Sequence, residues 1–144
     1  MVYSWWRPKS RNNRLKEHID FVVELLEDED STIRGYSAYV LYDWRKFEYA
    51  ENIAKLLRDS DPLVRRISVY GLGVLAGQKH IKQITDLLKD DDKNVRLIVL
   101  NTLAVNNAKQ SINEIRNCLL DPDQEVVERA KRVLKSLSVD AEID

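Results

Sequence analysis

The chain has 144 residues, of which 44% are hydrophobic and 33% charged, and its formal net charge is −1. This is enough apolar side chain for the continuous core of one domain, which excludes a disordered chain. Four Gly and three Pro, with abundant Leu, Ala, Glu, Lys and Arg, favour helices over a loop-rich β fold. The single cysteine, Cys118, cannot form an internal disulfide, which suits a reducing compartment.

Residues 1–17 form a basic, aromatic leader with a net charge of +4, which includes YSWWRPKSRNNRLK at positions 3–16. One interpretation is that Trp5 and Trp6 cover the apolar end of the first helix pair. The other is that they bind a nucleic acid or an anionic surface together with the cations. Arg7 and Pro8 interrupt any export signal, and no run of about 18 apolar residues follows, so we expect a cytoplasmic protein without a membrane span.

A short string recurs at a fixed interval in the rest of the chain. LLEDEDSTIR at 25–34, LLRDSDPLVR at 56–65 and LLKDDDKNVR at 87–96 are 31 residues apart. One further step reaches CLLDPDQEVV at 118–127, where Val127 replaces the arginine of the other copies. The period predicts a repeat domain over residues 18–137, with units 18–48, 49–79, 80–110 and 111–137 and an acidic tail at 138–144.

Each unit predicts two helices, because its apolar positions change phase once. In the first helix the apolar residues follow the spacing i, i+3, i+6, i+7 of one helical face. The four sets are Ile19, Val22, Leu25, Leu26; Ala50, Ile53, Leu56, Leu57; Ile81, Ile84, Leu87, Leu88; and Ile112, Ile115, Cys118, Leu119. The residues between them are mostly polar, so we expect the first helix to be the outer one.

An aspartate is expected to cap the start of each second helix. These residues are Asp30, Asp61, Asp92 and Asp123, and Pro62 occupies the first helical position of the second copy. The expected core sets are Ile33, Ser37, Val40, Leu41; Val64, Ser68, Gly71, Leu72; Val95, Val99, Thr102, Leu103; and Val126, Ala130, Val133, Leu134. Gly77 and the pair Asn106 and Asn107 are expected to end the second helices of copies two and three.

The D-x-D-x-x-V-R core and the period of 31 resemble HEAT repeats, in particular the short HEAT-like units of phycobilin lyase subunits. The resemblance covers residues 18–137 and implies an all-α solenoid of about four helix pairs, with the second helices on its concave side. It also implies a ladder between neighbouring repeats, formed by Asp28, Asp59 and Asp90 with Arg34, Arg65 and Arg96. Val127 departs from the pattern and fits a C-terminal cap.

The second helices, aligned by the 31-residue step, give four rows across this concave side. They are Gly35, Arg66, Leu97, Glu128; Ala38, Val69, Leu100, Lys131; Tyr39, Tyr70, Asn101, Arg132; and Tyr42, Gly73, Ala104, Lys135. In the first three repeats these positions are mostly apolar or aromatic, which is typical of a partner site. We predict a groove for a protein or peptide segment, with contacts from Tyr39, Tyr42, Arg66, Val69, Tyr70, Leu97, Leu100 and Asn101. The alternative is that the tyrosines pack between adjacent helices and complete a thin core.

No pattern indicates catalysis, a metal or a cofactor. The acidic clusters at residues 28–30 and 90–92 lack the glycine and distal glutamate of a calcium loop. His18 and His80 have no Cys or His partner at metal-binding spacing. Cys118 occupies a position that is Leu in the other copies. Gly71 and Gly73 do not belong to a phosphate-binding motif. We therefore expect no catalytic residues and no enzyme activity.

The leading hypothesis is a non-catalytic protein-binding scaffold, acting as an adaptor, an assembly factor or a neutralising partner of the immunity-protein kind. The resemblance to phycobilin lyases implies an alternative, a subunit of a bilin chromophore lyase. A HEAT-like nucleic-acid-binding protein is less favoured, because the concave side has few cations apart from Arg66 and the body of the chain is mildly acidic.

Overall fold

The computed structural model describes residues 11–139 and the side chains of residues 17–138. In this range the chain forms α-helices and short 3-10 turns, and it contains no strand. The α-helices are α1 Arg11–Glu24, α2 Ser31–Asp43, α3 Ala50–Lys55, α4 Pro62–Leu75, α5 Ile81–Asp86, α6 Lys93–Val105, α7 Ile112–Asn117 and α8 Gln124–Val139. The 3-10 turns are Leu25–Glu27, Phe47–Tyr49, Leu56–Arg58, Gly77–His80, Leu87–Lys89, Lys109–Ser111 and Cys118–Leu120.

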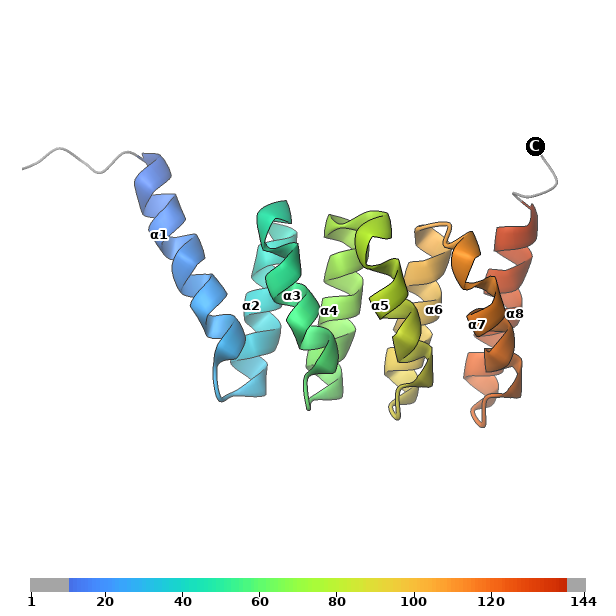
Figure 1. The fold of residues 1–144 in the computed structure, drawn as a ribbon. Helices are drawn as coiled ribbons and strands as arrows, with labels where there is room; N and C mark the ends of the chain where they lie inside the picture. The colour runs from blue at the N-terminus through green and yellow to red at the C-terminus, as the bar shows by residue number, and fades with distance from the viewer. Residues whose placement is uncertain (1–10, 140–144) are drawn as a thin grey trace, which may run out of the picture.

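The helices form four antiparallel pairs that stand side by side in chain order, which confirms the predicted all-α solenoid (Figure 1). The second helices α2, α4, α6 and α8 pack directly against their neighbours, whereas the first helices of neighbouring pairs make much less backbone contact. The more closely spaced layer of a curved stack is its inner layer. The second helices therefore line the inner face, and the first helices lie outside.

The recurrent string forms the turn between the two helices of each pair. Asp30, Asp61 and Asp92 are the N-cap residues of α2, α4 and α6, and each side chain accepts a hydrogen bond from a backbone N–H two residues later. Asp123 accepts the equivalent bond from the N–H of Glu125. These bonds satisfy amides that have no partner inside the helix.

The far ends of the second helices use the left-handed backbone conformation. Gly77 has φ of 50° after α4 and Asn107 has φ of 49° after α6, the two places where the sequence predicts helix ends. Arg45 occupies the same conformation after α2, with φ of 55°. Glycine adopts this conformation without strain and asparagine tolerates it, whereas arginine does not favour it.

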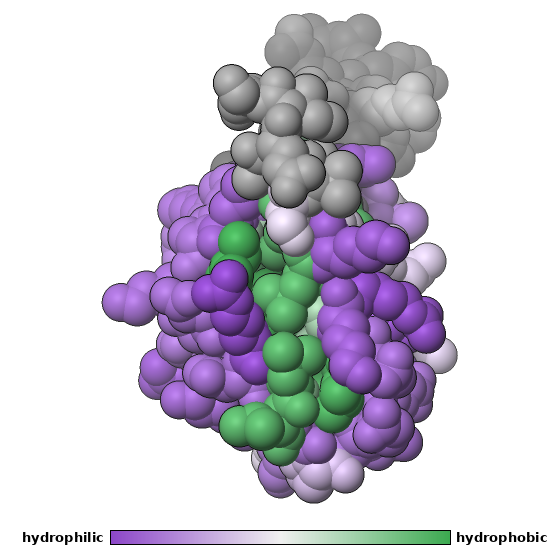
Figure 2. Space-filling view, turned by 90° about the vertical axis from the view of Figure 1, so that its right-hand side faces the viewer, coloured by the Kyte–Doolittle hydropathy of each residue, from purple (hydrophilic) through white to green (hydrophobic). Residues whose placement is uncertain are grey.

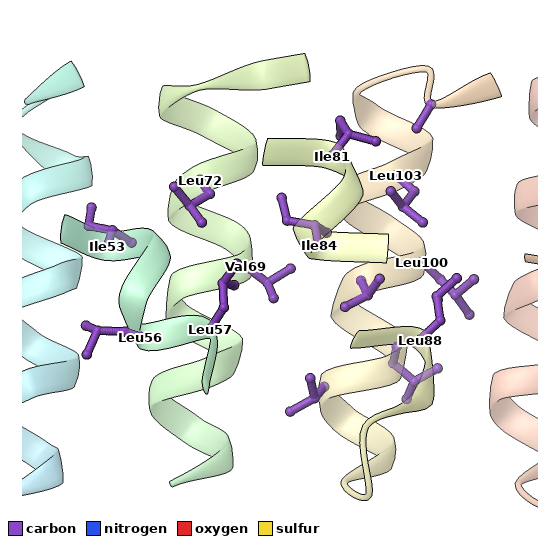
Figure 3. Packing of buried hydrophobic residues seen from close by; sticks show 14 of the residues in the cluster. Ile53, Leu56, Leu57, Val69, Leu72, Ile81, Ile84, Leu88, Leu100 and Leu103 are labelled. Carbon is purple, nitrogen blue, oxygen red and sulfur yellow. The ribbon is translucent and has the colours of Figure 1, made fainter. Parts of the chain in front are cut away.

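The core runs through the whole stack between the two helix layers. Leu41, Ile53, Leu72, Ile84, Leu103 and Ile115 are fully buried in one continuous cluster. Figure 3 shows how side chains from α3 and α5 meet those of α4 and α6. Gly71 allows α2 and α4 to pack closely, because a Cβ at this position would lie 3.2 Å from the ring of Tyr42.

The first and last helices extend across the predicted domain limits. Helix α1 begins at Arg11, so the predicted boundary between residues 17 and 18 falls inside a helix, and α8 continues to Val139. Trp5, Trp6 and residues 140–144 lie outside the described residues, so the predicted N-terminal cap stays a prediction. Within residues 11–139, no helix has the length and apolar character needed to cross a bilayer.

Candidate binding face and the ladder that shapes it

Arginines from three second helices bind aspartates of the following repeat. Arg65 Nε and Nη2 donate to Asp90 Oδ2 and Oδ1 at 2.8 and 2.7 Å, and Nη1 donates to the backbone carbonyls of Asp59 and Ser60. Arg34 binds Asp59 in the same way, and Arg96 binds Asp121. Each arginine thus connects its own interhelical turn to the next one.

The ends of this ladder differ from the predicted set. The carboxylate of Asp28 accepts a hydrogen bond from the backbone N–H of Asp30, and Arg34 contacts Asp28 only at its backbone carbonyl. Asp121, which was not predicted as a ladder residue, receives Arg96 instead. The arginine in each repeat therefore points toward the C-terminal end of the stack.

The ion pairs change the acidity of their carboxylates. The hydrogen bond from Arg34 lowers the pKa of Asp59 below its usual range, although burial opposes this effect. Burial raises the pKa of Asp90, but the hydrogen bonds from Arg65 and from the backbone of Asp92 outweigh burial and lower the pKa overall. Both aspartates are therefore ionised at neutral pH.

On the inner face, aromatic side chains form a connected cluster across the first two helix pairs. Tyr42 makes edge-to-face contacts with Tyr39 and Tyr70, at ring-centroid distances of 5.0 and 5.4 Å. Tyr39 and Tyr70 are exposed, whereas Tyr42 is half-buried beneath them. Burial raises the pKa of Tyr42, with smaller contributions from the other two tyrosines, so it keeps its proton well above neutral pH.

Two open grooves lie between consecutive second helices on this face. The first, of about 320 Å³ between α2 and α4, is lined in part by Tyr36, Tyr39, Leu63 and Ile67. The second, of about 390 Å³ between α4 and α6, is lined in part by Tyr70, Val74, Ile98 and Val105. Tyr36 is 68% exposed and Val105 is 85% exposed.

The fourth helix pair gives the inner face a different character. The row that contains Tyr36, Ile67 and Ile98 continues on α8 as Arg129, and the row that contains Tyr39 and Tyr70 continues as Asn101 and Arg132. Arg129 donates a hydrogen bond to Asn101 Oδ1, and Arg132 is exposed. The inner face thus passes from apolar grooves to a cationic end.

The prediction was wrong for three of the contact residues, because they are buried in the structure. Val69 and Leu100 are fully buried, and Leu97 is nearly so. Val69 and Leu100 lie on the sides of α4 and α6 that face the next helix pair, where they form part of the core between repeats (Figure 3). Of the remaining predicted residues, Tyr39, Tyr70 and Arg66 are exposed on the inner face, and Tyr42 and Asn101 are half-buried there.

The sequence reasoning missed most of the groove lining. Tyr36, Leu63, Ile67, Val74, Ile98 and Val105 were not predicted as contacts. Their signal was present in the sequence, because Leu63, Ile67, Tyr70 and Val74 follow the spacing i, i+4, i+7, i+11 of one helical face. Around the helix axis, this face lies about 100° from the rows that contain Tyr42 and Val69. An angle of 100° is the rotation between successive residues of a helix.

Other chemically capable groups do not assemble into a site within the described residues. No group of three or more metal-binding side chains occurs there. Cys118 is buried, and burial raises the pKa of its thiol, which makes it a poor nucleophile at neutral pH. His80 Nδ1 lies 2.6 Å from Gln83 Oε1, and its buried Nε2 lies 3.7 Å from Glu51 Oε1.

The fold and the ladder define a solenoid of helical repeats. A family model described as HEAT repeats matches residues 49–135, more than half of the chain. The chain therefore belongs to the HEAT-repeat family. No curated protein matches the chain. Among solved structures, an engineered protein from the Northeast Structural Genomics Consortium is similar, with a TM-score of 0.60 and 20% identity over 85% of this chain. The chain spans 63% of that protein's length, and at this identity the likeness concerns the fold alone.

Proposed function

We propose that the chain is a non-catalytic scaffold that binds a segment of another protein along the inner face of α2, α4 and α6. The observation that carries the proposal is the row of exposed apolar side chains that lines two consecutive grooves there. Removing such side chains from water is favourable, and exposed apolar patches bordered by polar residues are common at partner sites. HEAT repeats also commonly mediate protein interactions, which supports the same proposal.

The spacing of the grooves suggests the form of the bound segment. Packed helices lie about 8–10 Å apart, so consecutive grooves are separated by roughly that distance. An extended peptide covers this distance in about three residues, and a helix covers it in about seven. The partner segment therefore carries two apolar anchors at one of these spacings.

The cationic end of the face gives the bound segment a direction. Arg132 is exposed on α8, next to Arg129. An acidic residue on the partner, placed beyond the anchor that occupies the α4–α6 groove, would meet these guanidinium groups and fix the orientation of the segment. The bilin-lyase alternative rests only on the resemblance in the repeat units, and the apolar grooves fit a protein segment better than a nucleic-acid backbone.

A displayed library of random peptides, selected on the purified protein, tests this proposal. We expect enriched peptides to carry the paired apolar anchors and an acidic residue, and to bind the double variant Leu63→Asp/Val105→Asp at least about tenfold more weakly. The matched control is Phe21→Asp/Phe47→Asp, which adds the same charge at exposed positions that line neither groove, on α1 and in the turn before α3. Equal losses in both variants, or no enrichment at all, would contradict the proposal.

A further inference from the structure

We propose that the segment bound on the inner face is an amphipathic helix of another protein, an inference that rests on the proposed function. Two forms fit the spacing of the grooves, an extended strand and a helix. The hydrogen bonds and the shape of the inner face favour the helix. Such a helix buries one apolar side in the grooves and keeps its opposite side in water.

The polar side chains at the start of the first groove are already bonded within the chain. Ser31 Oγ donates a hydrogen bond to Asp61 Oδ2 at 2.6 Å, and Asp61 Oδ1 accepts one from the backbone N–H of Leu63 at 2.8 Å. The remaining polar side chains of the lining belong to exposed residues, which are Thr32, Tyr36 and Tyr39. The groove therefore offers mainly hydroxyl groups to a partner.

The polar residues of the second groove are also engaged. Asn101 Oδ1 accepts a hydrogen bond from Arg129, and Asn106 Nδ2 donates one to the backbone carbonyl of Thr102 at 2.9 Å. The backbone carbonyl of Asn106 accepts a hydrogen bond from Gln78 Nε2. Both asparagines thus already use one end of their side-chain amide inside the chain.

An extended segment needs hydrogen-bond partners for its backbone, and this face supplies few. Its inward N–H and C=O groups would lie against apolar side chains such as those of Ile67 and Ile98. Burying a peptide group without a hydrogen-bond partner is costly. A helix bonds its own N–H and C=O groups internally, so it brings only side chains to the face.

The shape of the inner face also suits a helix. On α4, Leu63, Ile67, Tyr70 and Val74 form a ridge at helical spacing, with one open groove toward α2 and the other toward α6. Packed helices place the side-chain ridges of one helix between those of the other. A partner helix can therefore place its anchors in the grooves that border this ridge.

The cationic end of the face adds an acidic residue to the same side of the partner helix. Arg132 is exposed on α8. Residues three or four positions apart lie on one side of a helix, so an acidic residue at this distance beyond the second anchor points toward Arg132. The expected pattern is apolar residues at i, at i+3 or i+4, and at i+7, followed by an acidic residue at i+10 or i+11.

Variants of a selected peptide distinguish a helix from an extended segment. The test takes a peptide whose binding is lost in Leu63→Asp/Val105→Asp. Proline between the anchors, on the side away from the protein, should weaken binding at least about tenfold, because it breaks a helix. Alanine at the same position is the matched control and should leave the affinity unchanged or raise it. The Cα chemical shifts of a 13C-labelled peptide should be helical in the complex.

A second control separates the grooves from general adhesion to apolar surface. The C-terminal end of the stack also exposes a hydrophobic stripe between hydrophilic borders (Figure 2). Leu120, in the turn before α8, is 89% exposed, and Val105, beside the second groove, is 85% exposed. Val105→Asp should weaken peptide binding, whereas Leu120→Asp should leave it unchanged.

The outcomes separate this inference from the proposed function. Extended chemical shifts in the bound peptide, or a proline variant that binds as tightly as the alanine variant, would overturn the helix and leave the proposed function in place. Equal losses in Val105→Asp and Leu120→Asp, or no peptide whose binding depends on the grooves, would overturn both.

Discussion

Removing the carboxylate of Asp90 tests how much the ladder contributes to stability. Arg65 and Asp90 are 11% and 5% exposed, and two charge-assisted hydrogen bonds join them. Breaking a buried ion pair by deleting one partner costs about 3–5 kcal/mol. Arg65 keeps Asp91 and two backbone carbonyls as partners, so we place the loss for Asp90→Ala at the lower end, about 3 kcal/mol.

Urea unfolding followed by circular dichroism measures this loss, since urea, unlike guanidinium chloride, does not screen charges. Arg65→Met should cost a similar amount, and the double variant should cost at least about 1.5 kcal/mol less than the sum, because neither charge is then left alone. Lys89→Met, at an exposed site, should change stability by less than about 0.5 kcal/mol. A loss below about 1 kcal/mol for Asp90→Ala, or additive single losses, would refute this reasoning.

Three further effects are expected from the turns and helix contacts. The pKa values of Asp59 and Asp90 are lowered in the folded state. The stability that their ionised carboxylates contribute is therefore complete above about pH 4, and it is lost as the pH falls through the folded pKa values. Urea unfolding midpoints measured over a series of acidic pH values test this loss. Arg45→Gly should raise the free energy of unfolding by about 1 kcal/mol, since it relieves a positive φ; a decrease would contradict this. Gly73→Ala should lower it by about 1–3 kcal/mol, because the new Cβ would lie 2.5 Å from Thr102 Cγ2, and an unchanged melting curve would show that α4 and α6 are not in such close contact.

The helix pairs and their caps could be predicted because the relevant residues are close in sequence. A capping aspartate and the amides it binds are two or three residues apart, so a repeated string indicates the same turn each time. Pro62 and Gly77 mark the two ends of α4 in the same way. The direction in which each arginine points depends on the stacking of whole repeats, and for that reason Asp121 was missed.

The inner face could be predicted only in part, because two rows have the same composition. The row Ala38, Val69, Leu100, Lys131 and the row Tyr36, Ile67, Ile98, Arg129 are both apolar in three repeats and cationic in the fourth. The first row is buried between repeats, and the second lines the grooves. Only the rotation of each second helix about its axis separates them, and neighbouring repeats set that rotation through contacts that are distant in sequence.

A photo-cross-linking amino acid placed at position 36 tests the central claim, that the inner face holds a protein partner, most directly. Tyr36 is exposed at the first groove, and Phe21, exposed on α1, provides the matched position in the outer layer. After irradiation of the native host, we expect a discrete cross-linked partner from position 36 that is absent from position 21 and lost when Leu63→Asp/Val105→Asp is added. The same adduct from position 21 alone, or from position 36 regardless of the added substitutions, would contradict the claim.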